Sequence, residues 1–150
     1  MNYKSKLIDK IKFESKSINL NNNFLQMKFS VGDTKIEIYG KINIDQIKLS
    51  KILLSIKKDE WPTFFQQLPG FFVIKIIRNE KITILNDIFG NYRLYYSTID
   101  KKFIIYDKYP GKNIDNKFEL EFFKKKSYTT PFSTFDTKIN KLFPGAILIF

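Results

Sequence analysis

Apolar and polar residues alternate along two neighbouring segments in the first third of the chain. Residues 24–31 (FLQMKFSV) and 34–42 (TKIEIYGKI) both alternate with a period of two, which is typical of half-buried β-strands. Gly32 and Asp33 stand between them, and both residue types favour tight turns. The two segments are therefore predicted to form a hairpin. The polar stretch before them, residues 17–23 (SINLNNN), is predicted to be a loop.

The period changes to that of a helix over residues 44–58. Four apolar side chains recur at i, i+3, i+4 and i+7, namely Leu49, Ile52, Leu53 and Ile56. They would share one helix face, and Asp45 is placed to cap its start. A second, short helix is predicted over residues 59–68, with Asp59 as its cap and Pro62 in its first turn, where proline is tolerated.

The second half of the chain is rich in strand-length runs of β-branched and aromatic residues. They predict two hairpins, residues 71–77 with 81–87 and residues 92–98 with 101–107, and a final strand at 146–150. A short helix is predicted at 118–126. The run FFVIKII at 71–77 is almost continuously apolar, so this strand is predicted to be buried on both faces. We expect residues 1–150 to form one α+β domain, a layered sandwich of antiparallel sheets with few flanking helices.

The composition excludes several kinds of chemistry. The chain has no cysteine and no histidine, so thiol catalysis, thiolate metal sites and a histidine general base are all excluded. We expect neither a metal nor a cofactor. No apolar run approaches the ~20 residues that span a bilayer, and the charged N-terminus does not resemble a signal peptide. These features favour a soluble, cytoplasmic protein with no membrane partner.

The charge of +11 arises from 26 basic and 15 acidic residues. A basic surface can bind nucleic acid, but only Arg78 and Arg93 are arginines, and arginine is the better reader of phosphate and guanine. The lysines are also scattered along the chain. We therefore favour a solvated basic surface and keep nucleic-acid binding as the less favoured alternative.

Three ordered motifs resemble the glutaminase domain of asparagine synthetase. The segment LPGFFVIKIIRNEKITILNDIFGNYRLYY is similar to that family's Leu-x-Gly-x-Phe strand and Asp-x-x-Gly element. TFDTKINKLFPGAIL is similar to its later Pro-Gly element, and IYGKINI takes the place of its Asn-Gly-Glu motif. The matching residues are Leu68, Gly70, Phe71, Asp87, Gly90, Leu94, Tyr95, Tyr96, Thr134, Ile139, Leu142, Pro144 and Gly145.

The resemblance implies a fold and the loss of an activity. The family is that of the class II glutamine amidotransferases, whose N-terminal-nucleophile fold stacks two antiparallel sheets between helical layers. Active members use an N-terminal cysteine exposed by removal of Met1, but Asn2 follows here. The oxyanion-stabilising Asn-Gly pair aligns with Tyr39 and Gly40, and the family's arginine aligns with Asn86. The chain thus resembles a glutaminase domain with no catalytic residue left.

Of the polar residues that bind glutamine in the family, Asp87 alone matches. One interpretation is that Asp87 organises its own turn through backbone hydrogen bonds. The other is that Asp87, with Tyr39 and Gly40, forms a vestigial substrate-binding site. Trp61 is expected to anchor the core, with an interface contact as the alternative.

Three functional hypotheses follow. The first is a noncatalytic domain that scaffolds or docks an ATP-dependent synthetase of the asparagine-synthetase type, in peptide or secondary-metabolite biosynthesis. The chain itself lacks the Ser-Gly-Gly-x-Asp-Ser motif of that synthetase. The second is a stand-alone module that binds an amino acid, a peptide or a protein. The third is a basic nucleic-acid binder.

Overall fold

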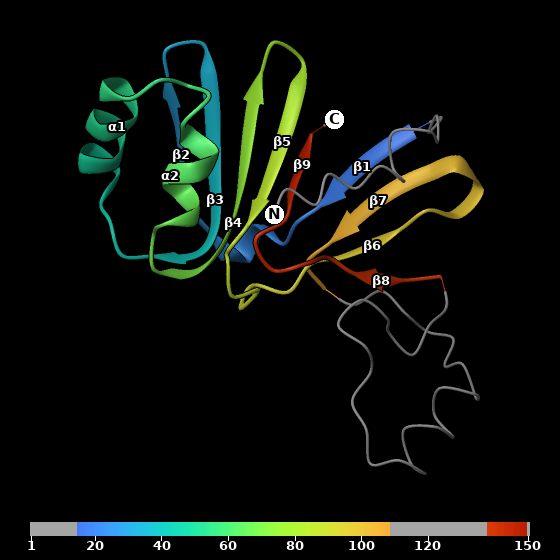
Figure 1. Cartoon of the computed structure of the whole chain (residues 1–150). Coiled ribbons are helices and arrows are strands. Elements are labelled where there is room, and N and C mark those ends of the chain that lie inside the picture. Colours follow the sequence, from blue (N-terminus) through green and yellow to red (C-terminus); the bar gives the residue numbers. More distant parts are fainter. Residues whose placement is uncertain (1–14, 109–137, 150) are drawn as a thin grey trace.

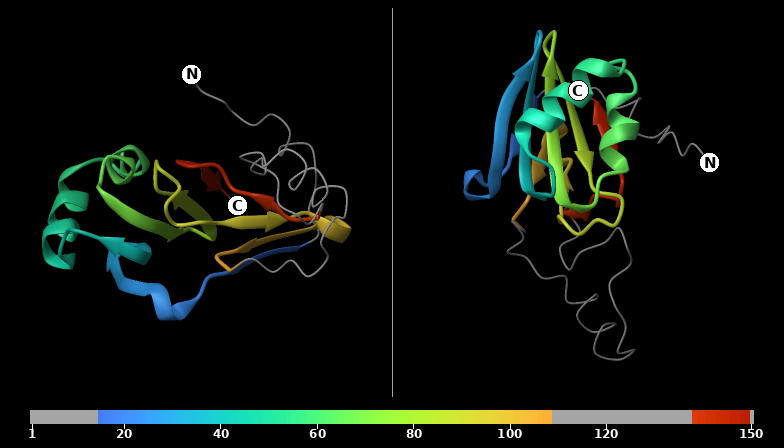
Figure 2. Two further views of the ribbon diagram at one scale, coloured as in Figure 1. Left: turned by 90° about the horizontal axis from the view of Figure 1, so that it is seen from below. Right: turned by 90° about the vertical axis from the view of Figure 1, so that its left-hand side faces the viewer.

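Two β-sheets lie face to face, with two helices on the outer face of the larger one (Figure 1). The structure is a computed structural model, and it describes residues 15–108 and 138–149. The two perpendicular views of Figure 2 show the helices on one side of the large sheet and the small sheet on the other. The predicted sheet-rich α+β fold is confirmed, whereas the predicted helix at 118–126 lies outside the described residues.

The large sheet has five strands in the order β2-β3-β4-β5-β9, all antiparallel. The strands are β2 (Leu25–Val31), β3 (Thr34–Ile42), β4 (Gly70–Arg78), β5 (Lys81–Asn86) and β9 (Ile147–Ile149). Both predicted hairpins of this sheet are present. Positive φ angles at Gly32 in one turn and at Asn79 and Glu80 in the other close these turns, as tight hairpins require.

The small sheet has four strands in the order β1-β7-β6-β8. They are β1 (Ser15–Asn19), β6 (Tyr95–Ser97), β7 (Lys102–Tyr106) and β8 (Asn140–Lys141). The predicted loop at 17–23 is wrong in its first half, because β1 pairs with β7, and this pairing is parallel. A single apolar side chain, Ile18, packs against the core here. One such contact suffices at a sheet edge, where the other positions of β1 stay exposed.

The two helices are shorter than the sequence pattern indicates. Helix α1 (Gln46–Ser55) is capped by Asp45, whose carboxylate accepts the Lys48 backbone N–H at 2.8 Å, as predicted. Helix α2 (Trp61–Gln66) has Pro62 in its first turn. The prediction that Asp59 caps α2 is wrong. Glu60 occupies the cap position, and its carboxylate instead accepts the Lys57 backbone N–H at 3.0 Å, which closes the preceding turn.

The core lies on both faces of the large sheet. On the helix side, Trp61 is 2% exposed and anchors the packing of α1 and α2 against β3 and β4, as predicted. On the other side, Val73 and Ile84 pack against Phe103 and Ile105 of the small sheet. Strand β4 is therefore buried on both faces at its centre, which confirms the prediction from its apolar run.

The predicted strand 92–98 is ordered as a strand only at β6. Before it, the backbone N–H of Tyr92 donates to the Asp87 carboxylate and the Leu94 carbonyl accepts the Leu142 N–H. These two backbone groups therefore connect loops and do not take part in hydrogen bonds between paired strands. Two 3-10 turns complete the described structure, Asn22–Phe24 and Ile99–Lys101.

Candidate functional site

An open cleft of about 530 Å³ lies between the two sheets. Strands β2, β3 and β4 form the floor of the cleft. The opposite wall is formed by the end of β1, the turn that follows it and the end of β7. The lining residues are Ile18, Asn19, Leu20, Asn21, Asn22, Leu25, Lys28, Glu37, Tyr39, Lys75, Asp107 and Lys108. The volume is in the range of small-ligand sites, and five of these residues are charged.

Glu37 is the centre of the charged floor. The register places it directly between Lys28 and Lys75 on the neighbouring strands. The carboxylate lies 3.0 Å from the Lys28 Nζ and 3.2 Å from the Lys75 Nζ. Burial would raise the pKa of the Glu37 carboxyl, but the hydrogen bonds from the two lysines outweigh it and hold this pKa below its ordinary value. Glu37 is therefore ionised at neutral pH.

Tyr39 is the third side chain that binds the Glu37 carboxylate. Its hydroxyl donates to the Glu37 Oε2 at 3.0 Å. Burial, followed by this hydrogen bond and the negative charge of Glu37, raises the pKa of Tyr39 to about 12. The hydroxyl stays protonated at neutral pH, so it can donate a hydrogen bond but is a poor nucleophile.

The opposite wall holds a second polar cluster, around Asp107. Its Oδ2 accepts the Asn21 backbone N–H at 2.6 Å and the Tyr92 hydroxyl at 2.7 Å. Burial and the bond to Asp107 raise the pKa of Tyr92. The Tyr92 ring meets Phe24 edge to face, with 6.2 Å between centroids. This cluster ties the small sheet to the loop before β2.

Asp87 lies outside the lining of the cleft, at the end of β5. The residue is 1% exposed. Its carboxylate accepts three backbone N–H groups, from Phe89 at 3.1 Å, Asn91 at 3.0 Å and Tyr92 at 2.8 Å. The interpretation of Asp87 as the organiser of its own turn is thus supported by the structure, whereas a contact between Asp87 and a ligand stays a prediction.

Gly40 is required by a close approach of two strands. Its φ angle is +97°, and a Cβ there would lie 2.2 Å from the Phe71 carbonyl oxygen and 2.8 Å from the Tyr92 ring. Two of the three residues predicted from the resemblance lie next to Tyr92. Gly40 leaves room for its ring, and the Asp87 carboxylate accepts its backbone N–H. The Tyr39 hydroxyl bonds to Glu37 instead.

The charged residues of the cleft were not predicted from the sequence. Strand alternation places three of them on one face of the large sheet: Lys28, Glu37 and Lys75. The small sheet packs against that face, and a sequence pattern does not predict which two sheets pack together. Asn86, which takes the place of the family's arginine, is 1% exposed, and its Nδ2 donates to the Phe143 carbonyl at 3.2 Å. It fastens the strand to the loop before β9.

The polar groups of the cleft are charged side chains, asparagine amides and the Tyr39 hydroxyl. Its described lining contains no serine, threonine, cysteine or histidine. Within residues 15–108 and 138–149, no three acidic, histidine or cysteine side chains gather as a metal site would need. No helix in the same part of the chain is long and apolar enough to cross a membrane.

Comparison with known proteins leaves the family open. No protein-family model matches the chain, and no curated protein matches it either.

Proposed function

We propose that this chain is a noncatalytic, glutaminase-like domain that docks an ATP-dependent, amide-forming synthetase. The proposal has two parts, the loss of glutaminase chemistry and the binding of a partner. The first is supported by the cleft, whose described lining offers a protonated tyrosine hydroxyl and a Glu37 carboxylate that is already paired with Lys28 and Lys75.

The glutaminase-like part of the proposal is supported by contacts between the motifs of the resemblance. The Asp87 carbonyl accepts the Gly145 N–H at 2.8 Å. A Cβ on Gly90 would lie 2.7 Å from the Pro144 side chain, so this position needs glycine. The motifs are separated by some fifty residues of sequence but form one joint, shown in Figure 1 where the chain after β5 meets the chain before β9.

The single observation that favours a docking role is an apolar patch on this joint. The apolar patch consists of Ile88, Phe89 and Phe143, which are 45%, 71% and 53% exposed. Ile88 lies beside Gly145, two residues from Phe143, so the two loops present these side chains together. Large apolar side chains gathered at one place on a surface mark interaction sites. Aromatic residues in particular are enriched in protein interfaces.

The docking role is tested by affinity purification of the tagged chain from the cells that produce it. We expect a protein with the Ser-Gly-Gly-x-Asp-Ser motif to be retained, and to be lost when Phe89→Asn and Phe143→Asn are combined. Leu54→Asn is the matched control, because Leu54 is 71% exposed on α1 and distant from the patch. Equal retention by the patch variant and the control would contradict docking at the patch. Absence of any such protein from the wild-type sample would contradict the docking role itself.

The loss of activity is tested separately. The purified chain is incubated with glutamine and the released glutamate is measured. We expect no release above that of buffer alone. Release that scales with protein concentration and disappears with Glu37→Gln would show that the cleft is catalytic and would overturn this part of the proposal.

A further inference from the structure

The inner face of the large sheet changes character halfway along one cross-strand row. The register aligns Lys28, Glu37 and Lys75 on β2, β3 and β4 with Ile84 on β5 and Leu148 on β9. The inner faces of packed sheets are normally apolar, and the half of the row at Ile84 and Leu148 packs against the small sheet in this way. The other half is charged, and it lines the cleft.

Charged side chains on the inner face of a sheet lower the stability of the fold unless they bind another group. Lys75 is the more enclosed of the two lysines, with a side chain 21% exposed, against 64% for Lys28. Placing an ammonium group on the inner face of a sandwich loses hydration energy, which an apolar residue would not. The salt bridges to Glu37 offset part of this loss, but an apolar row would need no such compensation. The row therefore favours a ligand-binding role over a purely structural one.

The floor of the cleft also carries an excess of positive charge. Two ammonium groups face the single carboxylate of Glu37, which already accepts a third donor, the Tyr39 hydroxyl. Each ammonium has three N–H donors, and Glu37 engages each lysine at one oxygen. On the other wall, Lys108 lines the cleft beside Asp107, whose Oδ2 is occupied by two donors. Three cations thus face two well-satisfied carboxylates.

We propose that this cleft binds a small oxyanion, a carboxylate or a phosphate ester, through the ammonium groups of Lys75 and Lys28. An ammonium group is a compact point charge that binds either anion. The cleft volume of about 530 Å³ accommodates a ligand of metabolite size. The Glu37 carboxylate, itself bound by the Tyr39 hydroxyl, holds the two lysines in place. This site is separate from the apolar patch, and its occupation does not depend on a synthetase partner.

The test is calorimetric titration of the purified chain with two probes, inorganic phosphate and succinate, at constant low ionic strength. We expect saturable binding of at least one probe. Saturation with phosphate alone supports a phosphate-ester ligand, saturation with succinate alone supports a carboxylate ligand, and saturation with both supports the shared oxyanion chemistry. Absence of saturable binding for both probes would overturn the proposal.

Variants assign the binding to the cleft. Lys75→Gln removes the charge but keeps an N–H donor for Glu37, so the fold is expected to survive, as a urea titration would show. We expect affinity to fall about tenfold or more, because hydrogen bonds to charged groups are among the stronger ones in proteins. Lys28→Gln, at the exposed edge strand, is a second variant with the same expected direction.

The matched control is Lys51→Gln, which makes the same change of charge at an exposed position of α1. It is expected to leave the affinity unchanged. If the control weakens binding as much as Lys75→Gln does, the anion responds to overall charge and the proposed site is wrong.

Discussion

Replacement of Asp87 by alanine tests what stabilises the joint between the chain after β5 and the chain before β9. The substitution removes the acceptor of three backbone N–H groups. The Tyr92 N–H is buried, and a buried donor left without a partner costs about 1–3 kcal/mol. The N–H groups of Phe89 and Asn91 are only partly buried, so water can replace part of what they lose. We expect Asp87→Ala to lower the free energy of unfolding by about 2–4 kcal/mol.

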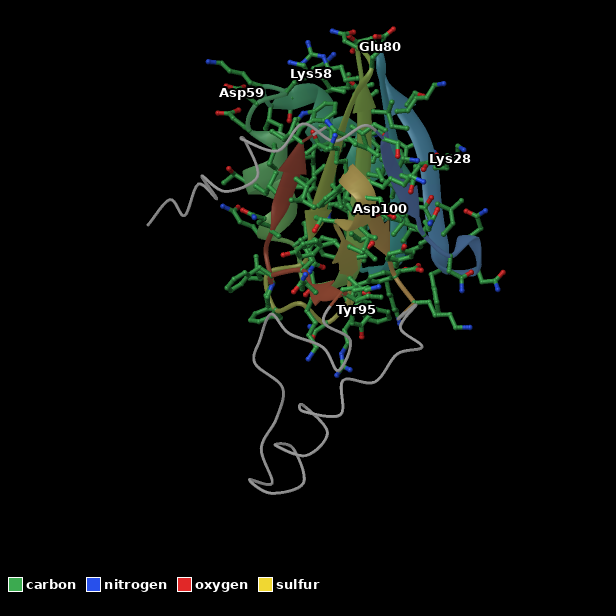
Figure 3. The ribbon with its side chains drawn as sticks, turned by 90° about the vertical axis from the view of Figure 1, so that its right-hand side faces the viewer. Lys28, Lys58, Asp59, Glu80, Tyr95 and Asp100 are labelled. Atoms are coloured by element: carbon green, nitrogen blue, oxygen red, sulfur yellow. The ribbon has the colours of Figure 1, made fainter. Side chains whose placement is uncertain are left out.

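The assay is urea denaturation at pH 7, followed by tyrosine and tryptophan fluorescence. A loss of this size is a large share of the ~5–15 kcal/mol that is typical of a domain. Asp59→Ala is the matched control, since it removes the same charge at an exposed site without a capping role; Figure 3 shows Asp59 at the end of the molecule away from Tyr95. Surface changes of this kind stay within about 0.5 kcal/mol. A loss below about 1 kcal/mol for Asp87→Ala would refute the account of the turn.

Three further substitutions test contacts on the two faces of the large sheet, all by urea denaturation. Gly40→Ala is expected to destabilise the fold by about 3 kcal/mol or more, because its Cβ would lie 2.2 Å from a backbone oxygen. A Cβ on Gly32 would meet only the flexible end of Lys58, with its Nζ at 4.0 Å, so Gly32→Ala should cost only about 1 kcal/mol; equal losses would contradict this. The pKa of Glu37 is lowered from its ordinary 4.5, so its stabilisation is complete above that pH and lost as pH falls through the folded-state pKa. The loss caused by Glu37→Gln should therefore be greatest at pH 7 and shrink below pH 4.5, and a pH-independent loss would contradict the ion pairing. Trp61→Phe leaves the buried Leu53 carbonyl without its 3.0 Å donor and should cost about 1–3 kcal/mol; no loss would show that this bond is dispensable.

Local chemistry accounts for the part of the fold that the sequence predicts. The two hairpins of the large sheet follow from alternation and from turn residues, and α1 follows from its apolar spacing and from Asp45. These features depend on neighbours within a few residues, which a sequence pattern records. The predicted cap of α2 is wrong because two acidic residues, Asp59 and Glu60, precede the helix. Which of them takes the cap position depends on the turn that the Lys57 N–H closes with the Glu60 carboxylate.

Long-range pairing accounts for what the sequence could not predict. Strand β1 has little apolar signal, and it forms because β7 offers a parallel edge more than eighty residues later. The charged row of the cleft is similar. Glu37 looks like a solvent-facing residue of an alternating strand, yet it is 7% exposed, because it lies between two lysines from strands on either side. By contrast, Asp87 could be singled out from its Asp-x-x-Gly context, since its main contacts lie within five residues.

Gene sequencing tests the proposal that this domain works with a synthetase rather than as an enzyme itself. The reading frame beyond codon 150 and the adjacent genes would be sequenced in the source genome. We predict a Ser-Gly-Gly-x-Asp-Ser ATP motif, either in the continuing frame or in a neighbouring one. Absence of that motif from both would contradict the proposal.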